Sequence, residues 1–213
     1  MGNSQGGILG PTIAALEPPS SRFDRLALGV GGISYPIMLP RSCDWVNMPL
    51  RTLLSGAYPN PIDQSLLMVM FASHWDLFEG ATFAPHIRDT MSTLHGSATP
   101  PDILFQIAVN DPGTPEVAGE IAARTMGLPY LASSLDHPSN RMPWGLAPTG
   151  ASPTSALVSF DLGTSPVPDG PTVSDAVCEA INGHPEMNAH EMLRRRADAQ
   201  AQIANFFDTG IIR

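Results

Sequence analysis

A serine framed by glycines stands at the start of the chain. The run Gly2-Asn3-Ser4-Gln5-Gly6 has the pattern G-x-S-x-G, and apolar residues at helical spacing follow it. In a tight turn from a strand into a helix, such a serine is held in a strained backbone conformation with its hydroxyl exposed, and flanking glycines leave room for neighbouring elements. The pattern predicts Ser4 as a nucleophile and the N–H of Gln5, at the helix N-terminus, as an oxyanion donor. The alternative interpretation is a Gly-rich turn without chemistry.

An acid and two histidines follow in an order that could complete a catalytic triad. Asp111 comes directly after an apolar run that ends at Val109, where a carboxylate could orient a histidine. Asp-Pro-Gly is also ordinary turn chemistry. His184 and His190 lie later in the chain, and either could be a surface histidine. The order Ser, Asp, His, each beyond a strand, is one of the arrangements that support nucleophilic catalysis.

The elements that must position these residues alternate between helices and strands. Apolar runs predict strands over 25–30, 103–109 and 156–160, and helical spacing predicts helices after Ser4, over 116–126 and over 192–207. This alternation predicts the α/β class, with a mostly parallel sheet and helices on its faces. Such sheets carry their chemistry in loops at the carboxyl ends of strands, where the candidate residues stand.

Residues 33–101 interrupt this alternation. Several prolines precede a long amphipathic stretch, Asp63 to Phe78, in which Phe71, Trp75 and Phe78 share one helical face. Core packing explains such a stripe, and so does a lid helix that lines an apolar substrate pocket. We therefore predict one domain over 1–213 in which 33–101 form a helical cap or lid insertion.

Composition excludes several classes of function. A net charge of −9 argues against a surface that binds nucleic acid, and the basic run at 194–196 is typical of a solvated helix face. No stretch approaches eighteen apolar residues, and no export signal is visible. Cys43 and Cys178 could pair, but they form neither a disulfide framework nor a zinc spacing. Neither a metal nor an organic cofactor is expected, while compartment and oligomeric state stay open.

Several segments together resemble bacterial α/β-hydrolase-fold proteins of the esterase and lipase type. They are Gly2–Ile8, Arg25–Val30, Trp75-Asp76, Asn110-Asp111 before Ala118–Gly127, and His190 with Arg194-Arg195 and Gln202-Ile203. In such relatives the triad acid opens the loop after a late strand, and the histidine precedes an Arg-Arg pair and a final helix. The resemblance thus implies Asp111 as the acid and favours His190 over His184. Glu191 departs from the family, which often has a small residue after the histidine.

The resemblance also implies what the chain does and where it begins. It implies hydrolysis of carboxylic esters with an apolar part by Ser4, His190 and Asp111, with a non-catalytic binding or structural module on the same scaffold as the alternative. An α/β-hydrolase normally has about half its sheet before the nucleophile turn, whereas only Met1 precedes Gly2 here. The chain is therefore expected to be the C-terminal part of such a domain, without the N-terminal strands and with impaired activity.

Overall fold

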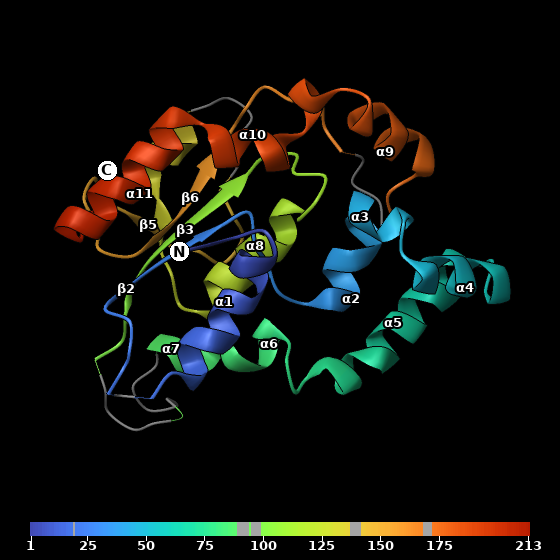
Figure 1. Ribbon diagram of the computed structural model, residues 1–213, viewed down its shortest axis with the longest axis horizontal. Helices are drawn as coiled ribbons and strands as arrows, with labels where there is room; N and C mark the ends of the chain where they lie inside the picture. The colour runs from blue at the N-terminus through green and yellow to red at the C-terminus, as the bar shows by residue number, and fades with distance from the viewer. Residues whose placement is uncertain (19, 89–93, 95–98, 137–141, 168–171) are drawn as a thin grey trace.

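A parallel sheet forms the centre of the molecule (Figure 1). The computed structural model describes residues 1–213 except 19, 89–93, 95–98, 137–141 and 168–171. Within that part the sheet has six strands, and all of its strand pairs are parallel. In spatial order they are β1 (Gly2–Asn3), β2 (Arg25–Gly29), β3 (Asp102–Ala108), β6 (Ala156–Phe160), β4 (Tyr130–Leu131) and β5 (Pro148–Thr149). The predicted α/β class is confirmed.

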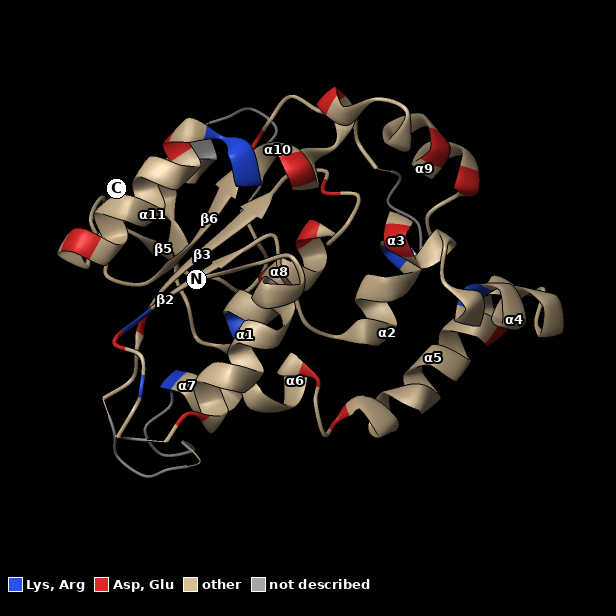
Figure 2. Cartoon of the chain, viewed as in Figure 1, with Lys and Arg blue, Asp and Glu red and all other residues tan. Residues whose placement is uncertain are grey.

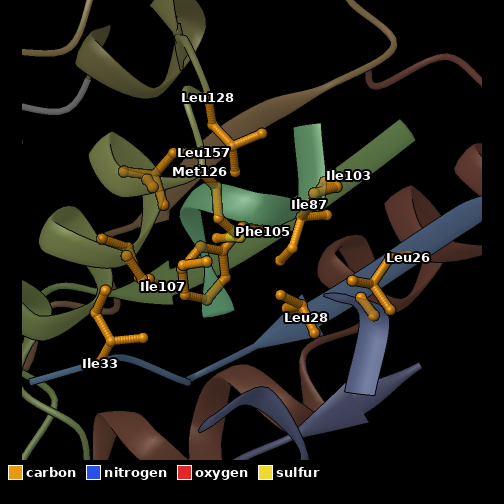
Figure 3. Packing of buried hydrophobic residues seen from close by; sticks show 14 of the residues in the cluster. Leu26, Leu28, Ile33, Ile87, Ile103, Phe105, Ile107, Met126, Leu128 and Leu157 are labelled. Atoms are coloured by element: carbon orange, nitrogen blue, oxygen red, sulfur yellow. The ribbon is translucent and has the colours of Figure 1, made fainter. Parts of the chain in front are cut away.

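Strands β2 and β3 are buried on both faces. Ile103, Phe105 and Ile107 of β3 belong to one apolar cluster, while Leu104 between them belongs to another. Successive side chains of a strand point to opposite faces, so a continuous apolar run supplies both layers of the core. Figure 3 shows the first cluster, in which residues of β2 and β3 meet Ile87 and Met126.

Helices cover both faces of this sheet. The first face is packed by α1 (Gln5–Leu16), α6 (Gly80–Phe83), α7 (Pro85–Arg88) and α8 (Glu116–Thr125), and the second by α10 (Ala189–Arg195) and α11 (Ala197–Thr209). Phe206 of α11 is completely buried against the second face. The helix predicted over 192–207 is two helices, since the backbone of Arg196 is extended between them. The break lets α10 and α11 take different directions, which one straight helix could not do.

The buried face of α1 differs from the one that its large residues predict. Ile13 and Leu16 are half exposed, whereas Gly7, Gly10 and Ala14 are buried. A Cβ atom on Gly7 would lie 2.6 Å from the carbonyl oxygen of Gly29 in β2. The helix therefore approaches β2 too closely for large side chains, and its small residues face the sheet.

The described part of the segment between β2 and β3 consists of short helices joined by loops. It contains α2 (Tyr35–Met38), η1 (Leu39–Arg41), α3 (Cys43–Val46), α4 (Pro49–Ala57) and α5 (Pro61–Trp75) before α6 and α7. Figure 1 shows α4 and α5 projecting away from the sheet, on the right of the view. Ile87 of α7, in contrast, is fully buried in the sheet core, so the end of the segment returns to the main body. Among the described residues no helix is long and apolar enough to cross a membrane.

A disulfide joins this insertion to the segment after β6. Cys43 in α3 is bonded to Cys178 in α9 (Asp175–Asn182), with their Cα atoms 5.3 Å apart across a sequence separation of 135 residues. Apolar side chains, including Val173 and Ile181, surround the bond. The pairing that the sequence left open thus fastens α3 to the part of the chain that leads into α10 through η3 (Pro185–Met187).

Removing this cross-link should destabilise the protein. We expect the double variant Cys43→Ser, Cys178→Ser to lose about 2–5 kcal/mol of unfolding free energy, because the unfolded chain regains the entropy of a long open loop. Urea unfolding followed by circular dichroism measures the loss. Dithiothreitol should lower the stability of the unmodified protein similarly and leave the double variant unchanged; equal stability of all samples would contradict the prediction.

Candidate active site

Ser4 occupies the turn between β1 and α1. Its backbone has φ 56° and ψ −118°, a combination that a non-glycine residue rarely adopts, and its N–H donates to the carbonyl oxygen of Gly29 at 2.9 Å. Such conformations cost on the order of 1–3 kcal/mol and persist only where the surroundings impose them. The strained turn expected from the G-x-S-x-G pattern is present.

The glycines of this turn have different roles. A Cβ atom on Gly2 would lie 2.4 Å from the backbone oxygen of Gly6, so only glycine fits at the first position. A Cβ atom on Gly6 would meet no described atom within 4 Å. The expectation that both flanking glycines make room for neighbours therefore holds for Gly2 and not for Gly6. The close approach on the helix side occurs one residue later, at Gly7.

Asp111 is held rigidly in the loop after β3. Its side chain is buried, and Oδ1 accepts hydrogen bonds from the backbone N–H groups of Gly113 at 2.7 Å and Thr114 at 2.8 Å. Asn110 before it takes a left-handed conformation with φ 60°, which Asn tolerates better than most residues. The turn chemistry of Asp-Pro-Gly and the role of an orienting carboxylate are thus combined in one residue.

His190 connects the acid to the serine. Its Nδ1 lies 3.0 Å from both carboxylate oxygens of Asp111, and its Nε2 lies 2.8 Å from the Oγ of Ser4. A carboxylate only accepts hydrogen bonds, so Nδ1 carries the proton and Nε2 is free to accept the Ser4 O–H. His184, the other histidine considered from sequence, is exposed and contacts Glu186 instead.

The imidazole is buried between backbone and carboxylate. A Cβ atom on Gly113 would lie 2.9 Å from the Cγ of His190, so the loop packs directly against the ring. Burial lowers the pKa of His190 because it disfavours the imidazolium ion, but the hydrogen bond and the charge of Asp111, helped by Asp44, outweigh it. The net pKa is raised above its ordinary value of 6.5. The site therefore stabilises the protonated histidine that forms when a serine is deprotonated.

The backbone N–H of Gln5 follows Ser4 directly in the chain. Gln5 begins the twelve-residue helix α1, and no hydrogen bond between described residues uses this N–H. The first N–H groups of a helix have no intrahelical partner and carry partial positive charge. This donor can stabilise negative charge on an oxygen next to Ser4, as predicted for an oxyanion site.

A largely apolar pocket opens at Ser4. Its volume is about 600 Å³, and its walls include Ser4 and Gln5 together with Tyr35, Met38, Leu39, Trp45, Met48 and Trp75 from the insertion. Of the three aromatic residues predicted to line a pocket, only Trp75 does so. Phe71 and Phe78 lie outside it and are 40% and 48% exposed. Sequence reasoning missed the contributions of α2 and α3 because four-residue helices give no periodic signal.

The insertion is tied directly to the loop of the acid. The Oγ of Ser42 donates to the carbonyl oxygen of Gly113 at 2.5 Å, and the N–H of Cys43 donates to the carbonyl oxygen of Pro112 at 2.7 Å. Farther along, the buried Glu79 accepts the N–H of Tyr35, which joins the start of α6 to the start of α2. The pocket walls are therefore placed relative to the triad by hydrogen bonds as well as by the disulfide.

Comparisons of the chain with protein-family models, curated proteins and solved structures gave no match. Within the described ranges, no group of three or more His, Cys, Asp or Glu residues is arranged to hold a metal ion.

The two adjacent glycines of α1 offer a matched pair of substitutions. Gly7→Ala should cost about 3 kcal/mol of unfolding free energy, because the new methyl group meets the backbone of Gly29 and Gly31. Gly6→Ala should change stability by less than about 1 kcal/mol, since its methyl group points into open space and alanine favours helices. Thermal unfolding measures both. Equal effects would show that α1 does not approach β2 as closely as described.

Proposed function

We propose that this protein is a serine hydrolase that cleaves carboxylic esters, built as an α/β-hydrolase. The observation that carries the proposal is the unbroken hydrogen-bond chain from Ser4 through His190 to Asp111 at the mouth of an apolar pocket. The strained nucleophile turn and the chain order Ser, Asp, His also support it, because α/β-hydrolases combine these features. Nucleophile, base and orienting acid are then present in one site.

The chemistry follows from the positions of the protons. His190 Nε2 takes the hydroxyl proton as Ser4 Oγ attacks the ester carbonyl carbon, and the carbonyl oxygen gains negative charge that the Gln5 N–H stabilises. The C–O bond to the alcohol then breaks, and the imidazolium returns its proton to the departing alkoxide. Water repeats the sequence on the acyl-enzyme and releases the acid and free Ser4. Asp111 steadies the imidazolium in both halves.

The pocket favours esters with an apolar part. Its walls are mostly Leu, Met, Trp and Tyr side chains, and burial of apolar substrate surface against them gives roughly 25 cal/mol per Å². This mechanism requires no metal ion or organic cofactor, because Ser4, His190 and Asp111 supply both nucleophile and acid–base catalysis.

A fluorophosphonate probe tests the proposal at the nucleophile. We expect a covalent adduct on Ser4, identified by mass spectrometry of the tryptic peptide, and its loss in Ser4→Ala and His190→Ala. His184→Ala is the matched control and should label normally, since that histidine is exposed and contacts Glu186 instead of Ser4. A folded protein without an adduct would favour the alternative of a non-catalytic module.

The pH dependence tests the pairing of His190 with Asp111. The base must be neutral, so kcat/KM for p-nitrophenyl butyrate should fall as the pH drops through the His190 pKa, which lies above 6.5. Asp111→Asn removes the carboxylate that contributes most to raising this pKa. We expect the inflection to move to lower pH and the rate to fall about 10³- to 10⁴-fold. If Asp111→Asn left the inflection at the same pH, Asp111 would not be the group that raises the pKa of His190.

A further inference from the structure

Two pockets meet at the nucleophile. The apolar pocket described above and a second, smaller pocket of about 160 Å³ share Ser4, Asp44 and Gly113. Gln5 lines only the larger pocket, and His190 lines only the smaller one. An ester bound to Ser4 therefore has two different environments for its two parts.

The position of His190 decides which part enters which pocket. The imidazolium must protonate the departing alkoxide oxygen, so the alcohol part has to lie on the side of His190. The smaller pocket then receives the alcohol, and we call it the alcohol pocket. The larger pocket, with its apolar walls and the Gln5 N–H, receives the acyl chain, and we call it the acyl pocket.

The alcohol pocket contains one carboxylate that is not neutralised by a neighbour. Glu191 lies 2.6 Å from Arg194, which also lines this pocket, so these two residues together add no net charge to its lining; Arg195, 3.0 Å from Glu191, does not line it. Asp111 is buried, and its carboxylate is hydrogen-bonded to the imidazole of His190. Asp44 is exposed, and among the described residues it has no ion-pair partner.

The backbone of Asp44 is held in place. Its backbone N–H donates to the Oγ of Ser42 at 3.1 Å at the start of α3, and the neighbouring Cys43 is held by the disulfide and by Pro112. The acid on α3 is visible as the red segment of that helix in Figure 2. Asp44 lines both pockets, and its charge raises the pKa of His190, so its field reaches the reacting atoms. Arg194, which lines the smaller pocket, acts on this pKa in the opposite direction.

We propose that Asp44 is a specificity-determining residue that makes this site select esters by charge. The preferred substrate is an ester of an apolar acyl chain with a small uncharged or cationic alcohol, and esters with a carboxylate on the alcohol are rejected. The proposal rests on the ester hydrolysis proposed above. At separations of roughly 7 Å near a wet surface, one unit charge changes the binding of another by roughly threefold to fivefold.

Three octanoyl esters with the same acyl chain test the charge selection: ethyl octanoate, choline octanoate and the octanoyl ester of glycolate. In the unmodified protein, kcat/KM should decrease from the choline ester through the ethyl ester to the glycolate ester. We define the choline-to-glycolate ratio as kcat/KM for the choline ester divided by kcat/KM for the glycolate ester. Asp44→Asn should lower this ratio roughly tenfold, because it removes both the attraction of the cationic alcohol and the repulsion of the anionic one. Asp63→Asn is the matched control, since Asp63 is exposed on α5 and lines neither pocket; its ratio should be unchanged.

The outcomes separate the two proposals. If ethyl octanoate is not hydrolysed, ester hydrolysis itself is overturned. If ethyl octanoate is hydrolysed and Asp44→Asn leaves the choline-to-glycolate ratio unchanged, only the role of Asp44 is overturned. Fluorophosphonate labelling of Ser4 verifies that Asp44→Asn has folded. Should it fail to fold, the ratio in the unmodified protein must still fall as ionic strength rises, and a salt-independent ratio overturns the role.

A second variant tests the assignment of the pockets. Met48 lines only the acyl pocket, so Met48→Ala should reduce the preference for ethyl octanoate over ethyl acetate several-fold through loss of apolar contact. It should leave the choline-to-glycolate ratio unchanged. A changed alcohol preference with an unchanged acyl preference would reverse the assignment.

Discussion

The hydrogen bond between Ser4 Oγ and His190 Nε2 joins residues that are 186 positions apart, and it constrains most of the structure. It can form only if the ends of β1, β3 and β6 reach the same edge of one sheet. Parallel pairing puts them there: β1 lies beside β2, which lies beside β3, and β3 lies beside β6. The short strand β1, with its glycine that admits α1, is therefore as important to the site as the long buried strands.

A second set of contacts holds the loops that carry the acid and the base. Loops at strand ends are the least constrained parts of a parallel sheet. Here the backbone of Gly113 packs on the imidazole, Ser42 and Cys43 bind the loop of Asp111, and the disulfide links α3 to α9. The hydrogen bonds of Ser42 and Cys43 connect the insertion between β2 and β3 to the loop of Asp111, and the disulfide connects it to the segment that leads to His190. The insertion consequently forms walls of the pocket at Ser4 and also supports the loops that carry Asp111 and His190.

Electrostatics at the site come from a few partly balanced charges. Burial and the charge of Arg194 lower the pKa of His190, while Asp111 and Asp44 raise it, and the net pKa is raised. Asp111 acts through direct hydrogen bonds, whereas Asp44 acts across the pocket. The same exposed carboxylate that helps the imidazolium would also repel an anionic alcohol, so catalysis and charge selection share one residue in the proposed mechanism.

The sequence by itself determined the α/β class and the approximate extents of β2, β3, β6 and α8, because buried strands leave local patterns. It also singled out Ser4 and Asp111 as candidates, but it left His184 and His190 as alternatives, between which only the family resemblance favoured His190. It could not determine that Ser4, Asp111 and His190 meet, that Cys43 bonds to Cys178, or that α1 turns its small residues inward. Nor did it indicate the pocket walls from α2 and α3, or the two-residue strands β4 and β5. Those features depend on contacts between distant segments, and such contacts exist only once the sheet has brought the strand ends together.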